Sequence, residues 1–446
     1  MPELSSAEII RLNKEYTLFE WNAQAAYNPI PAVRAQGVHF WDADGKRYID
    51  FNSQLMNVNI GHGDARIIKA IQEQAAKLPY VSPYHATDVR GRLGETLAQI
   101  TPGNLKKSFF TNGGSDANEN AIKMARLVTG RQKIIARYRS FHGATAGASA
   151  LTGDPRRWAS EPGVPGIIHV IDPYRYRCRW CGDLPQCNLS CLNHIADVIE
   201  FEGPQTIAAV VIETVTGTNG ILTPPDGYLQ GLRDLCTRHC ILLIVDEVMS
   251  GFGRTGKWFA VDHWNVVPDI MCVAKGLTSG YAPLGAAILS EPIAKYFDDR
   301  VLWAGLTYGA HALGCAAALA TINVYKEDRL IERAAEMGRF LGQELEKLKA
   351  KHPSVGDVRY IGLFSILELV RNRKTRAPMA PFNARADQMG PMAQVAKFFR
   401  ENGLFTFVRW NTFFVNPPLC ITREELLEGL EIIDRALEIT DDSVIE

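Results

Sequence analysis

Two side chains between residues 241 and 275 have the types and the setting that covalent catalysis requires. An apolar run that begins at Ile241 ends in the carboxylates Asp246 and Glu247, and a second apolar run, 270–274, ends in Lys275. In an open α/β sheet, ligands bind in the crevice outside the carboxyl ends of the strands. A carboxylate in that crevice can keep a heteroaromatic nitrogen protonated, and a lysine can form an imine with an aldehyde.

Each of these residues also has an ordinary interpretation. Asp246 could simply end its strand, and a single lysine after a strand is most often a solvated loop cation. The flanks of Lys275 favour a site, because 271–274 is a buried-strand pattern and the glycine-rich GLTSGYAPLGA follows it. An aldehyde that forms an imine and a ring nitrogen that stays protonated are the features of pyridoxal phosphate. The pair therefore predicts that cofactor.

A phosphate site is predicted where the strand pattern 107–111 meets the helical pattern 116–129. The turn between them reads Asn112-Gly113-Gly114-Ser115-Asp116. Adjacent glycines let a ligand approach the backbone closely, and the free amides at the start of a helix bind an anion. Taken alone, the turn could be a helix capped by Ser115 or Asp116. Because Asp246 and Lys275 are predicted in the same sheet, we interpret it as the phosphate site.

Composition and charge exclude several classes of partner. The 48 basic and 49 acidic residues give a formal net charge of −1, so the chain has no electrostatic footprint for nucleic acid or a lipid surface. No apolar run reaches the length of a membrane span, and the N-terminal MPELSSAEIIRLNKEY mixes both charges, unlike a signal peptide. We expect a cytoplasmic protein that binds neither nucleic acid nor membrane.

Strand and helix patterns alternate through the middle of the chain. Apolar strand patterns lie at 107–111, 133–138, 167–171, 206–213, 241–246 and 270–274, with helical patterns at 116–129, 194–201 and 227–238. Near-continuous apolar strands that alternate with helices predict an α/β fold with a mostly parallel sheet flanked by helices. At 446 residues the chain is also longer than one core usually supports, about 250–300 residues, so a second domain is expected.

The two ends of the chain have a different pattern and predict that second, smaller domain. A hairpin across Asp44-Gly45 and a helix at 64–78 are predicted near the start. After a long helical stretch at 310–351, the chain mixes short strands at 405–409 and 413–415 with helices at 392–402 and 423–439. We predict a small α+β domain from both chain ends. Its segments are 1–70 and 326–446, and the large cofactor-binding domain is 71–325.

Several motifs share their order and spacing with one enzyme family. They are GVHFWDADGKRYIDF, NIGHG, TNGGSDANENAIKMAR, SFHG, DEVMSGFGRTGKWFA, PDIMCVAKGL, LTYG and NPPL. With them the chain resembles the class III aminotransferases, the ω-amino group of fold type I pyridoxal phosphate enzymes, from about Trp21 to the C-terminal helix. The resemblance implies ping-pong transfer of an amino group from a donor to a keto acid. It also implies a homodimer, or a tetramer, with active sites at the subunit boundary.

The resemblance assigns roles around the cofactor ring. Lys275 would carry the cofactor as an imine and, once released by substrate, shuttle a proton between the substrate carbon and the cofactor. Asp246 would pair with the pyridine nitrogen and keep the ring cationic. Phe141 and Val248 would lie on opposite faces of the ring, although either side chain could be ordinary core. His142, next to Phe141 in the SFHG motif, is placed in the cofactor site.

Further roles follow from matched positions. Gly114 and Ser115 would bind the phosphate, and Thr307 of LTYG would reach it from the other subunit. Glu213 matches an acid at the end of a strand that supports the site. Arg409 matches the arginine that binds the carboxylate of the acceptor, for which its planar fork is suited.

Three departures from the family pattern concern the substrate. In relatives that act on ornithine and 4-aminobutyrate, a glutamate five residues after the Glu213 position masks the arginine, whereas this chain has Thr218 there. We therefore expect Arg409 to have no ion-pair partner, and we find no second arginine in a matched position. Met56 occupies a place where many ω-amine transaminases have Trp, and we place it with Trp21 in the substrate site.

The third departure is the segment YRYRCRWCGDLPQCNLSC, which resembles an insert of taurine–pyruvate and related ω-amino acid aminotransferases. Its cysteines Cys178, Cys181, Cys187 and Cys191 could bind a structural zinc, pair as disulfides or stay free. The spacing is short for a zinc site, so no metal ligand is assigned. Arg409, Thr218 and the insert together predict an ω-amino acid as donor, with taurine or β-alanine leading, and pyruvate as acceptor. Simple amines stay open as donors.

Two alternatives from other classes stay open at this point. A racemase, aminomutase, decarboxylase or lyase on the same fold would share Lys275 and Asp246. A protein that binds the cofactor without catalysis is the second alternative, although its intact lysine, aspartate and phosphate turn weigh against it.

Overall fold

The computed structural model describes residues 4–182, 184 and 186–445, and within these residues the strands form three sheets. The largest is a seven-stranded sheet with the order β4-β10-β9-β8-β7-β5-β6. Its strands are β4 (Leu105–Thr111), β5 (Lys133–Arg137), β6 (Ile167–Val170), β7 (Ile207–Glu213), β8 (Leu242–Asp246), β9 (Ile270–Val273) and β10 (Gly285–Ser290). From β9 to β6 all neighbours pair in parallel, and only β10 runs antiparallel to its neighbours. The prediction of a mostly parallel sheet is confirmed.

Helices cover both faces of this sheet because its strands are apolar on both faces. Successive residues of a strand point to opposite faces. In β8, Ile244 packs in the cluster that holds α5 (Gly114–Thr129), whereas Leu243 and Val245 pack with α7 (Ser190–Glu202) and α8 (Tyr228–Arg238). The helices therefore bury the strand ends deep in the molecule, where a site can be shielded from water.

The remaining helices surround this sheet and form the ends of the chain. The α-helices are α1 (Ser6–Tyr16), α2 (Ser53–Met56), α3 (Ala65–Lys77), α4 (Asp88–Ile100), α6 (Ala146–Leu151), α9 (Glu291–Tyr296), α10 (Ala312–Glu327), α11 (Leu330–Lys351), α12 (Pro391–Glu401) and α13 (Arg423–Asp441). Short 3₁₀ segments are η1 (Pro155–Ser160), η2 (Arg175–Arg177), η3 (Pro204–Thr206), η4 (Ala260–His263), η5 (Lys275–Leu277) and η6 (Ala386–Gln388). No helix in the described part of the chain combines the length and apolar character of a membrane span.

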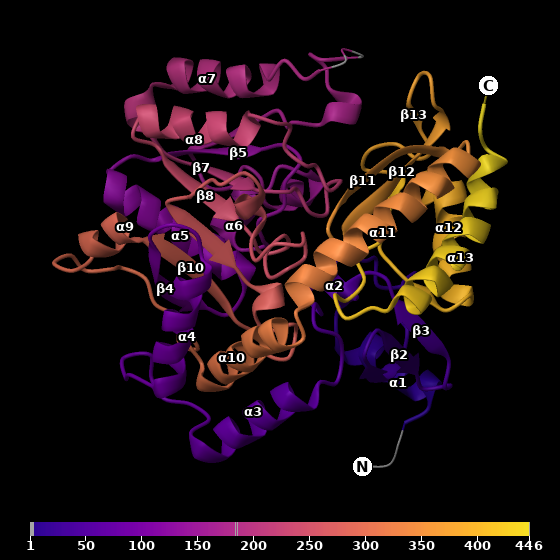
Figure 1. Ribbon diagram of the computed structural model, residues 1–446, viewed down its shortest axis with the longest axis horizontal. Coiled ribbons are helices and arrows are strands. Elements are labelled where there is room, and N and C mark those ends of the chain that lie inside the picture. The colour runs from indigo at the N-terminus through magenta and orange to yellow at the C-terminus, as the bar shows by residue number, and fades with distance from the viewer. Residues whose placement is uncertain (1–3, 183, 185, 446) are drawn as a thin grey trace.

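The two chain ends meet in the smaller part of the molecule. β1 (Ala32–Gln36), β2 (His39–Asp42) and β3 (Arg47–Asp50) form a sheet whose last strand is β14 (Leu404–Phe405), paired in parallel with β3. The third sheet contains β11 (Val355–Ile361), β12 (Phe364–Asn372), β13 (Ala377–Pro378), β15 (Val408–Arg409) and β16 (Thr412–Phe414). Figure 1 shows the indigo N-terminal strands beside the orange and yellow C-terminal elements. A small α+β domain built from both chain ends is confirmed, whereas the boundaries 1–70, 71–325 and 326–446 stay a prediction.

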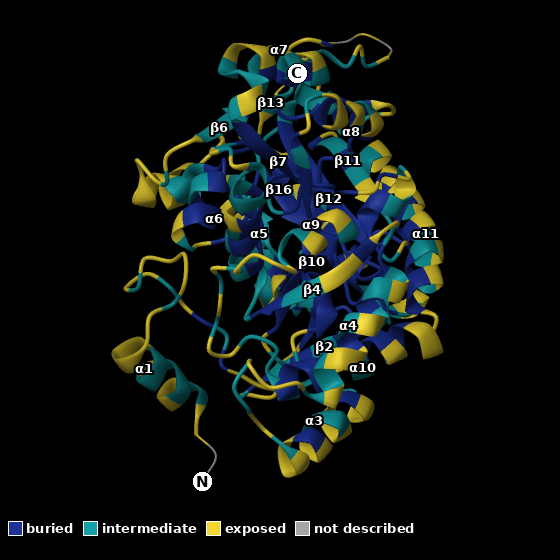
Figure 2. Cartoon of the chain, turned by 90° about the vertical axis from the view of Figure 1, so that its left-hand side faces the viewer, coloured by how far each residue is buried: buried dark blue, intermediate teal, exposed yellow. Residues whose placement is uncertain are grey.

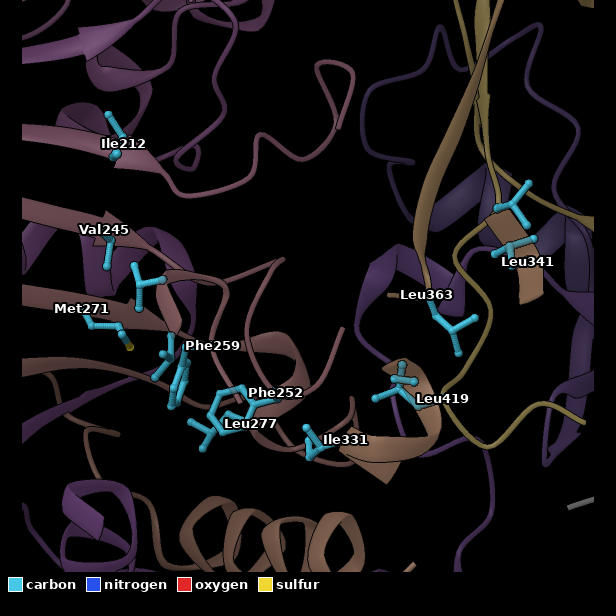
Figure 3. Close-up of a cluster of buried hydrophobic side chains, with 14 of the residues drawn as sticks. Ile212, Val245, Phe252, Phe259, Met271, Leu277, Ile331, Leu341, Leu363 and Leu419 are labelled. Carbon is cyan, nitrogen blue, oxygen red and sulfur yellow. The ribbon is translucent and has the colours of Figure 1, made fainter. Parts of the chain in front are cut away.

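One hydrophobic core connects the large sheet with the C-terminal elements. Figure 3 shows Val245 and Met271 on the strands of the large sheet, then Phe252 and Phe259, then Leu363 near the C-terminal part. All five side chains belong to one cluster of buried residues. In Figure 2 the strands β7 and β12 are dark blue, and exposed residues lie along outer helices such as α11. The two parts of the molecule are therefore packed against each other through a shared core.

Several elements of the structure were not predicted from the sequence. Among them are α4, the hairpin of β11 and β12, and β10, whose first two residues were included in a glycine-rich turn. β12 has buried Glu368 in its middle, and a charge at a buried position breaks the pattern that predicts a strand. Its partners Arg177 and Arg359 come from other segments, which a local pattern does not reveal.

Candidate active site

A cavity of about 460 Å³ opens at the carboxyl ends of β7, β8 and β9, next to the start of α5. Eight residues expected at the cofactor from the sequence line it: Gly114, Ser115, Phe141, His142, Glu213, Asp246, Val248 and Lys275. They come from segments 160 residues apart in the chain. Parallel strands place their carboxyl ends at one edge of the sheet, and that edge is where α/β proteins bind ligands.

Lys275 follows β9 directly and begins the short segment η5. Its backbone has a φ of 42°, a conformation that a lysine rarely adopts and that is often retained where function requires it. Burial lowers the pKa of Lys275 to about 8, and Arg156 acts in the same direction, while Asp246 and Glu213 oppose it. A larger share of this amine is therefore neutral near pH 7 than for an ordinary lysine, and a neutral amine is the nucleophilic form.

Asp246 is the last residue of β8 and is buried, with three donors to its carboxylate. His142 Nδ1 lies 2.9 Å from its Oδ2, and Asn118 Nδ2 donates to the same oxygen at 2.7 Å. The backbone N–H of Val248 donates to Oδ1 at 3.0 Å. Since a carboxylate only accepts, Nδ1 is the protonated nitrogen of the His142 ring. These contacts hold the carboxylate in place.

Glu213, at the end of β7, fixes two loops of the site. Its Oε1 accepts from the backbone N–H of Phe141 at 3.0 Å, and its Oε2 accepts from that of Gly217 at 2.7 Å. Burial raises the pKa of Glu213, Asp246 adds to the effect, and His142 opposes it. The carboxylate therefore positions the aromatic ring of Phe141 through its backbone.

The start of α5 forms a tight cradle of the size that an anion needs. Gly114 is the first residue of the helix, and a Cβ added there would lie 2.9 Å from Val248 Cγ1. A Cβ on Gly143 would collide with Ser115, whose Oγ accepts from the backbone N–H of Ala144 at 3.3 Å. Only glycines leave this space open, and helix-start amides attract negative charge. The residues present fit a phosphorylated aromatic aldehyde, with the phosphate at α5 and the reactive ends at Asp246 and Lys275.

Four residues expected at the site lie outside the cavity lining, namely Trp21, Met56, Thr307 and Arg409. Trp21 is largely exposed, and its ring meets that of Phe141 edge-on, with centroids 6.0 Å apart. Met56 is buried in a small apolar cluster, while its neighbours Leu55 and Asn57 line the cavity. Met56 packs in the same cluster as Met249, which does line the cavity, and its place in the substrate site stays a prediction. Thr307 is exposed, and its carbonyl accepts from the hydroxyl of Tyr80 at 2.9 Å.

Arg409 differs most from expectation, because it has an ion-pair partner. Its Nη2 donates to Asp154 Oδ2 at 3.1 Å, and its side chain is 11 % exposed. Burial lowers the pKa of Arg409 to about 10, Arg156 adds to the effect, and Asp154 opposes it. The expectation of an unpaired Arg409 is wrong, because Asp154 supplies a carboxylate from another loop.

Arg156 is a second arginine at the site, which the sequence reading missed. Its Nη2 lies 2.5 Å from Asp154 Oδ2 and donates to Thr218 Oγ1 at 2.7 Å. Its Cζ lies 3.6 Å from the ring centroid of Phe141. Thr218 therefore holds Arg156 by accepting its hydrogen bond. No periodicity marks Asp154 or Arg156 in the sequence, since Asp154 caps the short 3₁₀ segment η1 and Arg156 lies within it.

Asn118 was also missed, although a signal for it existed. It lies three residues after Ser115 on α5, and residues three apart share one face of a helix. Its other neighbour at the site is the carbonyl of His142, which accepts from Asn118 Nδ2 at 2.9 Å. A polar residue on the face that carries the phosphate turn is thus a predictable part of the site.

The cysteine-rich segment lies apart from the cavity, and two of its residues, Asp183 and Pro185, fall outside the described residues. Cys178, Cys181, Cys187 and Cys191 are all free thiols. Cys181 Sγ lies 3.5 Å from Cys187 Sγ. Among the residues with described positions, no group of three or more His, Cys, Asp or Glu side chains is arranged to hold a metal ion.

Comparison with known proteins supports one family over nearly the whole chain. Residues 22–437 match the model of the family "Aminotransferase class-III". The taurine–pyruvate aminotransferase of Bilophila wadsworthia is 34 % identical over 96 % of this chain and 97 % of its own length. A leucine/methionine racemase of Thermococcus litoralis is likewise 34 % identical, over 94 % of this chain and 93 % of its own.

A solved structure is similar throughout. The taurine:2-oxoglutarate aminotransferase of Bifidobacterium kashiwanohense, in complex with PLP and glutamate, superposes with a TM-score of 0.95. It is 41 % identical, and the match covers 100 % of both chains. The fold is that of fold type I pyridoxal phosphate transferases. The chain belongs to the class III aminotransferases and is a pyridoxal-phosphate-dependent enzyme of that family.

Proposed function

We propose that this enzyme transfers an amino group from an ω-amino acid, with taurine or β-alanine as leading donors, to a 2-keto acid such as pyruvate. The observation that carries this proposal is the lysine amine of lowered pKa near the Asp246–His142 pair, in a cavity lined by Phe141, on whose ring Arg156 stacks. Arginines suit donors and acceptors that carry acid groups. The names of the relatives given above support both the donor class and the use of a keto acid.

When bound, pyridoxal phosphate supplies an electron sink that stabilises negative charge on the substrate carbon. Lys275 would hold the cofactor and would move a proton at the substrate carbon. Asp246 would face the ring nitrogen, and His142 and Asn118 hold Asp246 in position. The lowered pKa of Lys275 suits this work, because a base acts best when its pKa is near the working pH.

The walls of the cavity orient the cofactor. Gly114 and Ser115, at the start of α5, would bind the phosphate. Phe141, held by Glu213, and Val248 would confine the two faces of the ring. Val248 also donates its backbone N–H to Asp246, so the ring position and the carboxylate position are coupled.

We further propose that the enzyme works as a homodimer. Thr307 is exposed outside its own cavity and would complete the phosphate site of the partner subunit. Large side chains near it are exposed, including those of Trp303 and Tyr308. Exposed aromatic groups of this size are typical of a surface covered by a partner. The cytoplasmic location stays a prediction.

A half-reaction tests the proposed activity. Holoenzyme given taurine or β-alanine without acceptor should release one equivalent of carbonyl product per subunit and then stop. Addition of pyruvate should restart the release. A racemase would release no carbonyl product and would instead invert a chiral amino acid, which contradicts the proposal. If ornithine or 4-aminobutyrate with 2-oxoglutarate proved much faster than taurine or β-alanine with either keto acid, the donor assignment would be wrong.

A further inference from the structure

A second cavity, of about 620 Å³, lies outside the active site and is larger than the active-site cavity. Its wall is formed by the end of β5 and the residues that follow it, by η1, and by the segment 171–180, which runs into the cysteine-rich insert. Within the described residues, no side chain lines both cavities. Cavities of about 300–1,000 Å³ are of the size that holds small molecules. This one has room for a ligand of its own.

Positive charge dominates the lining of the second cavity. It contains a single carboxylate, Asp172, against four guanidinium groups, those of Arg139, Arg157, Arg177 and Arg179. Asp172 is buried and already engaged, because its Oδ1 lies 3.7 Å from Arg137 Nε and its Oδ2 accepts the backbone N–H of Arg139 at 2.7 Å. The lining therefore suits an anion.

Two of the four arginines are neutralised by acids beside the cavity. Arg157 Nε lies 2.9 Å from Glu161 Oε1, and Arg177 Nε lies 2.5 Å from Glu368 Oε1. These two ion pairs explain why the structure holds Arg157 and Arg177 where it does. They leave the charges of the other two arginines to be accounted for.

Arg139 and Arg179 have no carboxylate partner within the described part of the chain. The Arg139 guanidinium stacks instead on the rings of Tyr174 and Phe382, with its Cζ 4.8 and 5.0 Å from their centroids. Arg179 is exposed and makes no ion pair, side-chain hydrogen bond or ring contact with any residue that the structure describes. The cavity thus has two positive charges to offer to a ligand.

Exposed aromatic side chains surround these arginines. Four line the cavity and are between 38 and 53 % exposed, namely Tyr138, Trp158, Trp180 and Phe382. Exposed apolar groups gathered at one place are typical of a binding site. The Trp180 ring packs on His194, with centroids 5.6 Å apart, whereas the Trp158 ring contacts no ring or cation among the described residues. The Trp158 indole is therefore free to stack on a flat ligand.

We propose that this cavity is a second ligand site, which binds a planar aromatic ring that carries a phosphate group. Trp158 stacks on the ring, because aromatic rings bind one another face to face or edge to face. Arg139 and Arg179 bind the phosphate, whose geometry matches the fork of a guanidinium. A phosphate monoester carries about 1.5 to 2 negative charges near pH 7, which matches the two unpaired cations.

Two kinds of molecule share this chemistry, a nucleoside phosphate and free pyridoxal phosphate. The nucleoside phosphate has a sugar between its ring and its phosphate and suits the larger cavity better. Isothermal titration calorimetry of the holoenzyme distinguishes the two, with AMP, ADP and ATP in one arm and pyridoxine 5′-phosphate in the other. The holoenzyme already holds its cofactor in the active site, and pyridoxine 5′-phosphate lacks the aldehyde that Lys275 would attack. Adenosine and inorganic phosphate each carry only one of the two features, so both should bind far more weakly than AMP.

Two substitutions test the residues that the proposal names. Trp158→Ala should raise the Kd of the bound nucleotide by about 10- to 100-fold through loss of stacking. Arg179→Gln should raise it by a similar factor through loss of a charged hydrogen bond. Both side chains are exposed, so neither change should shift the thermal midpoint of the ligand-free holoenzyme by more than a few degrees.

Matched controls come from exposed residues outside the lining. Phe201→Ala removes an exposed aromatic ring at the end of α7, and Arg238→Gln removes an exposed arginine of α8 that has no ion pair among the described residues. Both should keep the wild-type Kd within about twofold.

The outcomes separate clearly. Nucleotide binding that depends on Trp158 and Arg179 supports the site, and binding of pyridoxine 5′-phosphate alone with the same dependence supports it with the other ligand. No binding of any aromatic phosphate, equal losses in the control variants, or equal affinity for inorganic phosphate would overturn the inference. Because the measurement does not involve turnover, a negative result leaves the proposed transamination untouched, and absence of transamination leaves the second site untouched.

Discussion

At the scale of single residues, the setting of Lys275 makes its chemistry depend on pH in a definite way. Its pKa is lowered from 10.5 to about 8 by burial. We expect the rate at which the apoenzyme attaches pyridoxal phosphate to rise with pH and to level off above about pH 8. Absorbance of the bound cofactor, followed at each pH, measures this rate. A rate that still rises to pH 10 would show that the amine is not shielded as described.

The lowered pKa of Lys275 also makes the stability of the folded chain depend on pH in a definite direction. Between about pH 8 and 10.5 the unfolded chain binds a proton at this lysine and the folded chain does not, so stability rises with pH across that window. Below about pH 8 both states are protonated, and burial of the charged amine is a constant cost.

Lys275→Ala tests the covalent role directly. The variant should fold, since the side chain lies in a cavity and supports no core contact of the strand before it. It should still bind the cofactor weakly through the start of α5, and it should turn over no substrate. Near-normal turnover by this variant would show that another group does this work.

Asp246→Asn keeps the shape of the side chain and removes its charge. Activity should fall by about 100- to 1,000-fold, the usual effect of losing one preorganised charge at a reacting centre. The amide NH₂ would also face donors from His142 and Asn118, which now share one oxygen. Cofactor content and the circular dichroism spectrum separate loss of chemistry from loss of fold. An unchanged rate would mean that a different acid protects the ring nitrogen.

Single residues also show what a sequence can and cannot predict about this site. Lys275, Asp246 and the Gly114–Ser115 turn follow strands, and strand ends are visible as the end of an apolar run. Asp154 and Arg156 lie at the start of the short 3₁₀ segment η1, where no apolar pattern places them beside Arg409. Thr218 was read as a neutral neighbour of Arg409, whereas it holds Arg156. The error arose because an ion pair between distant segments has no local signature.

At the scale of elements, apolar runs in the sequence predicted the five strands that pair in parallel, β5 to β9. β10 was missed because its first residues, Gly285-Ala286-Ala287, continue a glycine-rich segment, although all of β10 is buried. β12 was missed because Glu368 interrupts its apolar pattern. That carboxylate is satisfied by Arg177, 2.5 Å away, and by Arg359, 2.9 Å away. Buried charges with remote partners are where pattern-based prediction fails.

The start of α5 gives a prediction at the same scale. In Gly114→Ala the new Cβ would lie 2.9 Å from Val248 Cγ1, so the side chain that confines the cofactor ring must move. Such overpacking costs about 1–3 kcal/mol. We expect the affinity for pyridoxal phosphate to fall by about 10- to 100-fold, measured by titration of the apoenzyme.

Gly94→Ala is the matched control for that substitution. Gly94 lies within α4, and a Cβ added there meets nothing within 4 Å. Alanine in a helix interior is more stable than glycine by about 0.5–1 kcal/mol. The control should therefore raise the thermal midpoint slightly and leave cofactor affinity unchanged. If both variants bound the cofactor normally, the close approach at Gly114 would not matter for the phosphate site.

At the scale of the whole molecule, the exposed ring cluster around Thr307 bears on the dimer. Tyr80, Tyr308 and His311 contact one another, and the Tyr80 hydroxyl donates to the carbonyl of Thr307. These contacts hold Thr307 in a fixed place outside its own cavity. We predict that the dimer is obligate. As the enzyme is diluted, light scattering should show dissociation into monomers, and activity should be lost over the same range of concentration.

A hybrid dimer tests whether Thr307 works across the subunit boundary. Lys275→Ala should be inactive, and Thr307→Ala should lose about tenfold in cofactor affinity through one phosphate hydrogen bond. In a hybrid of the two variants, one site has neither group. The other site combines Lys275 of one subunit with Thr307 of its partner and is intact. At low cofactor concentration the hybrid should therefore show one wild-type site per dimer. If Thr307 served its own subunit, the working site would keep the weak cofactor affinity of Thr307→Ala. The proposal that Thr307 completes the site of the partner subunit would then be wrong.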